Sequence, residues 1–308
     1  MSTRAQTMRA TFGESPRLQH LLWLGVLLLP LGVHADTSKI VVVYDQKRGE
    51  LSPGTQAPSL EEMMNSIRSA SPTALTATLE YGERVECTEC IPLLEGKLLD
   101  GENAKVREMA AWWLRQRPFG YGRAAVRMRE VVAQDQDPVR RSRAAEALGE
   151  FLDVAGLPAL EHAAMEDSSA AVRLSAVRAL GRLNAREGQA VIAASFEDAD
   201  PTVRSAALDQ VLLVNGFGDS DAVLARLKDG DGEVRMKAAQ LAGQMRLLAG
   251  RDDLVAVLAG DKSAEVRQAA AWALGRIGGA AADLRTARDK DSDPSVQDAI
   301  AVALQMSP

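Results

Sequence analysis

The sequence has few of the residues that enzymes use for chemistry. Its 308 residues include two cysteines and three histidines, and aromatic residues make up 4% of the chain. His20 and His34 lie within the first 35 residues, which leaves His162 as the one histidine beyond them. A Ser-His-Asp or Cys-His arrangement could use only His162, and a zinc site would need further ligands besides the two cysteines. The sequence therefore predicts no catalytic residue, no metal site and no cofactor.

A surplus of positive charge is also missing. The chain has 36 Lys and Arg residues against 42 Asp and Glu residues, a formal net charge of −6. Residues 1–35 contribute three arginines and one glutamate, so the remainder of the chain has a net charge of −8. Proteins that follow a phosphate backbone need a continuous basic surface. We therefore do not expect nucleic acid as a partner.

Long hydrophobic runs are limited to one segment, from Leu21 to Val33. Arg4, Arg9 and Arg17 precede it, and Val33-His34-Ala35 follows as a small-residue cleavage site, which is the pattern of a secretory signal peptide. The run is shorter than the about 20 apolar residues that a membrane-spanning helix needs. The sequence predicts an exported protein, periplasmic or extracellular, with no stable membrane insertion after cleavage. An uncleaved membrane anchor is the alternative.

The segment after the predicted signal peptide differs in composition from the rest of the chain. Lys39–Tyr44 is the one clear β-strand candidate, and Ser52–Pro58 has the composition of a linker. The strand could pack on the first helices or pair with a partner's sheet edge, and a poorly ordered arm is the alternative. Ser59 and Glu62 form a capping box, and Ser71-Pro72 begins a second helix. These two helices are expected to cap the N-terminal end of a helical array formed by the rest of the chain.

A repeated unit fills the rest of the chain. Its pattern is clearest from Ser263 to Gly275, where a helix-capping residue stands three places before Val266 and small apolar residues follow at helical spacing. With the valine position called slot zero, the frame recurs every 30 to 34 residues. Such a period, with two short helices per unit, is typical of a solenoid. Slot zero holds Val106, Arg140, Val172, Val203, Val234, Val266 and Val296.

Each slot makes a separate physical demand on its residue. Slot minus three holds Asn, Asp or Ser in every unit, and these are preferred N-cap residues. Proline follows the cap at Pro138, Pro201 and Pro294, where its fixed φ suits the first helical position. We expect the second helix of each unit, the B helix, to begin there, after a first or A helix. Aspartate stands in the turn between them, and arginine follows slot zero in every unit except the last, which has Gln297.

These residues make the chain resemble the HEAT-like repeat family, in particular the short repeats first named for phycobilin lyases. The matching stretches are Asp200 to Arg204, Asp137-Pro138 with Ala144 to Gly149, and Val266 to Gly275. The resemblance covers roughly residues 90–304 and implies an all-α fold, a right-handed α-solenoid of about seven HEAT-like two-helix repeats with a short N-terminal strand and helical cap. The predicted domains are a signal peptide at 1–35, an N-terminal arm at 36–58, capping helices at 59–89 and the solenoid at 90–308.

The resemblance also implies a role for the turn aspartates and the B-helix arginines. In this family these residues typically bond within and between units and so form a ladder. Unit two departs from the pattern, because Arg140 occupies the apolar slot, although its long side chain could extend to solvent. The ladder residues are Asp135, Asp167, Asp198, Asp229 and Asp261 with Arg141, Arg173, Arg204, Arg235 and Arg267.

The helical period identifies which B-helix residues are free to bind a partner. Slots zero, four, seven and eight share one face, so slots two, six and ten point the opposite way. B helices line the concave side in solenoids of this family, and apolar residues on such a face suggest a protein-binding hot spot. Alternatively, the tryptophans could cover gaps left by alanine-rich cores. The candidate binding residues, called the stripe below, are Trp112, Leu174, Arg178, Leu213, Met236, Gln240, Trp272 and Arg276.

Cys87 and Cys90 are the two cysteines of the chain. A c-type haem site would need histidine at position 91, where the chain has Ile91. In an exported protein, the common outcome is a disulfide, here closing a short loop before the first repeat. A redox role is the alternative, since a CxxC at a helix N-terminus can lower a thiol pKa. No thioredoxin-like βαβ pattern surrounds it.

Taken together, these features predict a non-catalytic protein-interaction scaffold of the cell envelope. Its partner would be an unknown protein or peptide, bound along the concave face of the solenoid. Hydroxylases of similar helical-repeat architecture bind two irons through several His-Glu pairs, and a single histidine cannot supply these. A thiol-disulfide redox protein that uses Cys87 and Cys90 is the alternative function.

Overall fold

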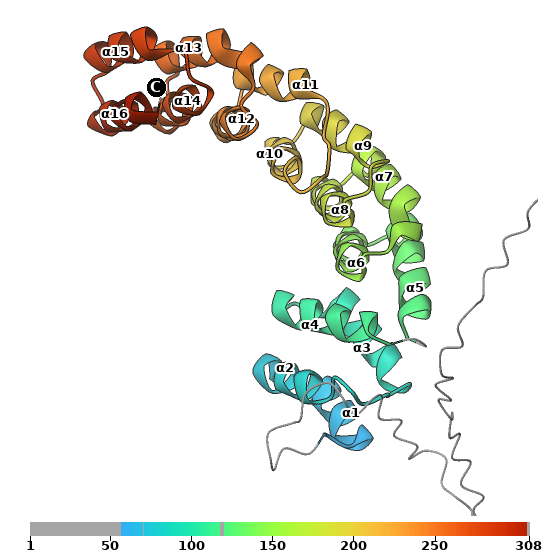
Figure 1. Cartoon of the computed structure of the whole chain (residues 1–308). Coiled ribbons are helices and arrows are strands. Elements are labelled where there is room, and N and C mark those ends of the chain that lie inside the picture. The colour runs from blue at the N-terminus through green and yellow to red at the C-terminus, as the bar shows by residue number, and fades with distance from the viewer. Residues whose placement is uncertain (1–56, 70, 118–119, 307–308) are drawn as a thin grey trace, which may run out of the picture. The chain divides into compact units, whose positions relative to one another are not determined.

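The chain folds as an array of short α-helices (Figure 1). This computed structural model describes residues 57–69, 71–117 and 120–306. The predicted signal peptide and the predicted strand at Lys39–Tyr44 lie outside the described residues. Within them, consecutive helices pair into units, and each unit packs on the next. The predicted all-α solenoid is therefore confirmed.

The helices of the repeats lie in two layers (Figure 1). No helix among the described residues is long and apolar enough to cross a membrane. Short 3₁₀ segments adjoin some of the A helices. They are η2 (Val154–Gly156) before α7, η3 (Ser195–Glu197) after α9, η4 (Arg226–Lys228) after α11 and η5 (Leu248–Gly250) before α13. The A helices are α3 (Cys90–Asp100), α5 (Tyr121–Gln134), α7 (Leu157–Glu166), α9 (Gln189–Ala194), α11 (Ser220–Ala225), α13 (Arg251–Gly260) and α15 (Ala281–Lys290). The B helices are α4 (Ala104–Arg115), α6 (Pro138–Phe151), α8 (Ala170–Leu183), α10 (Pro201–Gln210), α12 (Gly232–Gln244), α14 (Ala264–Ile277) and α16 (Pro294–Met306).

Side-chain caps fix where most B helices begin. The Asp200 carboxylate accepts a hydrogen bond from the Thr202 N–H at 2.8 Å, and the Ser263 hydroxyl accepts one from the Val266 N–H at 3.3 Å. Such a cap satisfies one of the N–H groups that the first turn of a helix leaves without a partner. Ser169 is the exception, because its side chain makes no cap hydrogen bond.

Neighbouring B helices approach closely through a glycine at slot nine. A Cβ on Gly149 would lie 3.0 Å from the Cα of Ala179 in the next B helix. The equivalent distance from Gly275 to Ala303 is 2.8 Å. Because neither residue presents a large side chain, the two backbones pack directly against each other, which matches the high alanine content of the core.

Unit four departs from this packing. Gln210 stands in the slot where the preceding unit carries Ala179, and its buried side chain fills the space over Gly181. Its Nε2 donates to the Ala206 carbonyl at 3.0 Å. The α10 helix then ends at Gln210, and Val211 and Val214 turn into the core. Leu213 was expected on the B helix and instead lies beyond its end, with 53% of its surface exposed.

Two helices precede the repeats, α1 (Leu60–Ser69) and α2 (Pro72–Tyr81), and pack on α3 and α4 respectively. Met63 and Leu79 are fully buried there. The indole N–H of buried Trp113 on α4 donates to the Gly82 carbonyl at 3.2 Å, and the same carbonyl accepts from Arg117 at 3.1 Å. The Gly82 carbonyl thus satisfies one donor of each of these two buried side chains where the helical pair covers the first unit.

Candidate functional site

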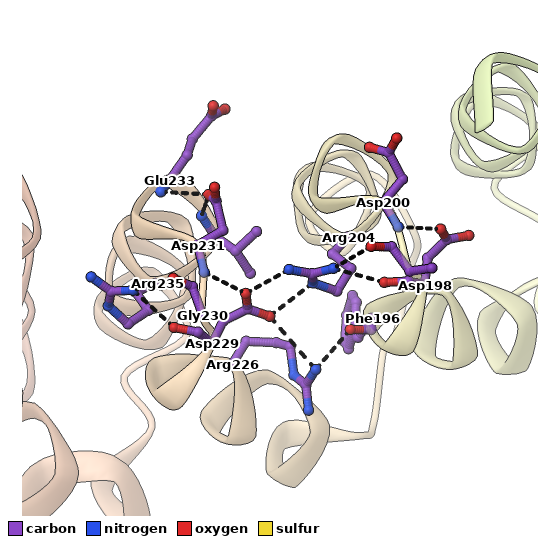
Figure 2. A network of polar contacts seen from close by, with 12 residues as sticks. Phe196, Asp198, Asp200, Arg204, Arg226, Asp229, Gly230, Asp231, Glu233 and Arg235 are labelled. Carbon is purple, nitrogen blue, oxygen red and sulfur yellow. Dashed lines mark hydrogen bonds and ion pairs between the residues drawn. The ribbon is translucent and has the colours of Figure 1, made fainter.

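An arginine of one B helix binds an aspartate of the following unit (Figure 2). Nε and Nη2 of Arg204 on α10 donate to the Asp229 carboxylate at 2.9 and 2.7 Å. Nη1 donates to the carbonyl of Asp198 in its own unit at 2.8 Å. Paired N–H donors facing a carboxylate give the strongest common side-chain contact. The same bidentate contact joins Arg141 to Asp167, Arg173 to Asp198, Arg235 to Asp261 and Arg267 to Asp291.

Each ladder aspartate also shapes its own turn. Asp229 Oδ1 accepts from the Asp231 N–H at 2.9 Å (Figure 2). Arg226 lies on the other side of the carboxylate, with Nη1 at 3.7 Å from Asp229 Oδ2 and at 2.8 Å from the Phe196 carbonyl. The Asp229 side chain is 3% exposed, and a carboxylate so deeply buried requires this degree of pairing. The ladder therefore joins a turn, a B helix and the next unit through one side chain.

The ladder aspartates remain charged at neutral pH. Burial raises the pKa of Asp229, but the hydrogen bonds from Arg204 and the Asp231 N–H outweigh burial, so that the pKa lies below its ordinary value. The hydrogen bond from Arg267 is the largest influence on Asp291 and lowers its pKa. The pKa of Arg204 is raised, chiefly by its hydrogen bond to Asp229.

At the N-terminal start of the ladder, the arginine that binds the Asp135 carboxylate is not the expected one. Arg107 does not bind the Asp135 carboxylate; its guanidinium contacts Glu146 at 3.3 Å. Asp135 is bound instead by Arg140 Nε at 3.0 Å, and Arg140 also pairs with Asp100 of the preceding unit. Arg140 could take this role because it occupies the slot that holds buried valine in the other units.

Sequence reasoning left Asp291 outside the ladder, although the spacing placed it in the aspartate slot. In the structure it is the partner of Arg267. The expected set ended at the last unit that carries both residues, because the final unit has Gln297 in place of the arginine. Arg267 donates to the backbone carbonyl of Asp261 in its own unit, and it donates to the carboxylate of Asp291 in the next unit. Sequence spacing alone does not show whether an arginine binds the carboxylate of its own unit or that of the next unit.

Apart from Leu213, the stripe residues lie in slots two, six and ten of α4, α8, α12 and α14, and α6, α10 and α16 carry none of them. Arg178 on α8, Gln240 on α12 and Arg276 on α14 are exposed. The apolar members Trp112, Leu174, Met236 and Trp272 are half-buried and pack against the core. The stripe therefore combines polar groups that are open to solvent with apolar groups that are partly covered.

Trp272 shows how the stripe is attached to the core. A Cβ on Gly243 of the preceding B helix would lie 2.7 Å from Trp272 Cζ3, so the indole covers the glycine. The Arg276 guanidinium lies 5.7 Å from the centre of the indole ring on the exposed side. The indole thus fills a gap, as one of the two interpretations from sequence expected, and part of it remains exposed. Its role in binding stays a prediction.

A groove between α4, α6 and α8 was missed by sequence reasoning. It has a volume of about 410 Å³ and lies where the first two B helices lack a ladder pair. Seven of its thirteen lining residues are charged, and five of these belong to the same outward-facing slots as the stripe. The charged residues of this groove are Arg107, Glu108, Arg143, Glu146, Glu150, Arg178 and Arg182. The signal in the sequence is the valine-to-arginine change at Arg140, which accompanies the altered ladder.

The cysteine pair lies at the start of α3, where the Cys87 and Cys90 sulfur atoms are at bonding distance. Both side chains are buried, at 1% and 0% exposed respectively. They join the segment after α2 to the first turn of the first repeat. This placement suits a pair that stabilises the junction between the capping helices and the solenoid.

Comparison with known proteins adds to this geometry. Residues 220–305 match the family model described as HEAT repeats. Residues 220–305 are therefore HEAT repeats. No match was found among curated proteins.

Solved structures resemble this chain in fold. The X-ray structure of Escherichia coli YibA is 22% identical, covers 78% of this chain and 98% of its own, and has a TM-score of 0.52. A chain of the structure of Kap95p with RanGDP is 14% identical, covers 80% of this chain and 38% of its own, and has a TM-score of 0.57. Human deoxyhypusine hydroxylase is 23% identical, with 80% and 95% covered and a TM-score of 0.36. At such identities the likeness concerns the fold alone.

Proposed function

We propose that this chain is a non-catalytic scaffold of the cell envelope that binds a protein or peptide along the stripe. The observation that carries the proposal is the arrangement of the stripe on the outward-facing slots of α4, α8, α12 and α14. Half-buried Trp112, Met236 and Trp272 alternate there with exposed Arg178 and Arg276. Aromatic and arginine side chains within a polar surround are the usual anchors of a protein interface.

The ladder supports this proposal because it holds the B helices at fixed positions. Each ladder arginine binds a carboxylate of the next unit and a carbonyl of its own unit. When a partner binds across several units, this surface is already ordered, so little conformational entropy is lost on binding. The acidic groups with lowered pKa in this layer are already engaged in ladder or cap contacts, which favours a structural role for them.

Export is the second part of the proposal and rests on the N-terminal sequence. The basic residues, the apolar run Leu21–Val33 and the site at Ala35 form a signal peptide, which directs the chain to the periplasm or beyond. N-terminal sequencing of the protein purified from its producing cell tests this. We expect the mature chain to begin at Asp36, and an intact N-terminus on protein from the cytoplasmic fraction would contradict export.

The binding proposal is tested by selecting peptides from a displayed library on the purified protein. Trp112→Ala combined with Trp272→Ala should weaken binding of the selected peptides at least about tenfold, as expected for hot-spot residues. The matched control is Val126→Ala with Met165→Ala, which removes exposed apolar side chains from the A-helix layer. Equal effects of the two double variants, or a library that yields no binder, would contradict the proposal.

A thiol-disulfide role for Cys87 and Cys90 is the competing function. A redox-active pair must be reached by a partner thiol, and the burial of both sulfurs favours a structural disulfide instead. Cys87→Ser with Cys90→Ser separates the two functions. A scaffold keeps its peptide binding after the change, with a modest loss of thermal stability because the closed loop is short. Loss of an insulin-reduction activity present in the wild type would favour the redox function.

A further inference from the structure

The groove between α4, α6 and α8 lies at a break in the ladder. Each later pair of neighbouring B helices, from α6 to α16, is joined by an arginine-aspartate contact between units. Between α4 and α6 the corresponding arginine, Arg107, contacts Glu146 on the outward side of α6 instead, and Arg140 of α6 pairs with Asp100 of the preceding unit. The space of about 410 Å³ at this junction is lined by seven charged side chains and by Leu98, Ala104, Ala111, Ala147, Ser175 and Ala179.

The charges in this groove are not balanced. Glu146 is paired with Arg107, Glu150 with Arg182, and exposed Glu108 with Lys105. The three carboxylates of the lining therefore already have cationic partners.

Two arginines of the lining have no carboxylate partner. Arg143 on α6 donates to the Leu99 carbonyl at 2.9 Å and makes no ion pair among the described residues. Arg178 on α8 is exposed and, within the same residues, makes neither a hydrogen bond nor an ion pair. A guanidinium offers five N–H donors and no acceptor. The groove consequently presents unused donors and positive charge in a chain whose overall charge is negative.

A second depression adjoins the groove and shares Glu108 and Glu150 with it. It has a volume of about 410 Å³, and its other lining residues are apolar Met109 and Trp112 and charged Glu80 and Arg115. Trp112 is half-buried, so part of its ring faces this depression. An aromatic wall next to unpaired arginines suits a segment that carries acidic and bulky apolar side chains close together.

We propose that this groove binds an acidic peptide segment of a partner protein, with Arg178 and Arg143 receiving a carboxylate and Trp112 receiving a neighbouring apolar side chain. The proposal rests on the scaffold function and specifies its partner. A carboxylate is the group that a guanidinium binds through two parallel hydrogen bonds. The negative field of the remaining surface disfavours acidic segments elsewhere, so the groove also selects where such a segment binds.

The test uses a fluorescein-labelled Glu-Leu repeat peptide and its Gln-Leu counterpart of equal length, with binding measured by fluorescence anisotropy. The Glu-Leu peptide should bind the wild type more tightly, and its affinity should fall as salt increases. Arg178→Glu should weaken binding roughly ten- to a hundredfold, because it removes a charge-assisted contact and adds repulsion. The matched control is Arg285→Glu, the same change at an exposed residue of α15 that has no ion pair among the described residues.

Several outcomes would overturn the proposal. One is an equal loss of peptide affinity from Arg178→Glu and Arg285→Glu, and another is equal affinity of the wild type for the two peptides. A third is full displacement of the peptide by free glutamate at the same concentration as the peptide, which would indicate a small-molecule site. Arg178→Gln provides a second variant that adds no repulsion, and thermal unfolding followed by circular dichroism verifies folding of each variant. If selected library peptides bind the wild type and the Arg178→Glu variant equally well, only this proposal is contradicted. If the library yields no binder, the scaffold function itself is contradicted.

Discussion

Gly243 on α12 lies directly against Ala273 on α14, so close that a Cβ on the glycine would stand 2.7 Å from the Cα of the alanine. The same Cβ would meet Trp272 Cζ3 at 2.7 Å. One of these two contacts is with backbone, which cannot move away without displacing a helix. The spacing between these B helices therefore depends on the absence of a side chain at position 243.

Gly243→Ala is expected to destabilise the protein by about 1–3 kcal/mol through overpacking. Urea unfolding followed by circular dichroism measures the change. Gly96→Ala on α3 is the control, because nothing lies within 4 Å of a Cβ at that position. There the lower entropy of the unfolded chain should stabilise the protein by about 0.5–1 kcal/mol. A neutral result for Gly243→Ala would mean that α12 and α14 can separate freely.

Asp229→Asn tests the contribution of one ladder contact. The change leaves Arg204 charged and without its anionic partner, at a position where the two side chains are 3% and 14% exposed. The loss in unfolding free energy is expected to be about 3–5 kcal/mol, as for a broken buried pair. Asp209→Asn removes the more exposed partner of Lys237 and should cost about 0–1 kcal/mol. Similar losses at both positions would argue that the ladder contributes no more than surface ion pairs.

Acid should destabilise the solenoid through the ladder aspartates. In the folded protein the pKa values of Asp167, Asp198, Asp229, Asp261 and Asp291 lie below the ordinary carboxyl value of 3.8. A lowered folded-state pKa contributes stability that is fully present above the unfolded value and is lost as pH falls through the folded value. The urea midpoint should therefore be constant near neutrality and decrease as pH falls through and below about 4.

The Asp229→Asn variant provides the control for this pH dependence. With one titrating ladder carboxylate removed, its stability should fall less steeply with acid than that of the wild type. Parallel pH profiles for the two proteins would show that the acid sensitivity arises from other groups.

Asp200→Ala tests the cap that begins α10. Its carboxylate accepts hydrogen bonds from the Thr202 N–H and hydroxyl, and their loss should cost about 0.5–2 kcal/mol. The midpoint of thermal or urea unfolding reports the change. Ser169→Ala is the matched variant at the same slot, and it should have little effect because the Ser169 side chain makes no cap contact. The reverse order of effects would show that the slot assignment is wrong.

Much of the fold could be predicted because each unit repeats the same local demands. A cap residue such as Asp200, a proline such as Pro201 and the apolar spacing after Val203 act within one or two helical turns. Seven recurrences of that frame predict the number and type of helices. The early end of α10 was not predicted, because it depends on Gln210 occupying space over Gly181 of another helix.

The candidate site could be predicted only in part. The helical period placed Arg178, Gln240 and Arg276 on an exposed face, and they are exposed in the structure. Trp272 is half covered because its ring packs over Gly243 from the preceding unit, which no period within one helix reveals. The groove beside Arg143 was missed because it follows from a changed contact of Arg107 with Glu146, far apart in the sequence.

The sequence by itself determined the repeat frame, the residues that cap and begin each helix, and the types of residue in the ladder, since these depend on neighbours along the chain. The tertiary structure decided that Arg204 reaches forward to Asp229 rather than to the carboxylate of Asp198. It also decided where the ladder breaks and where a charged groove opens. These features depend on how closely two stacked helices approach, and that distance is set by side chains from different units packing together.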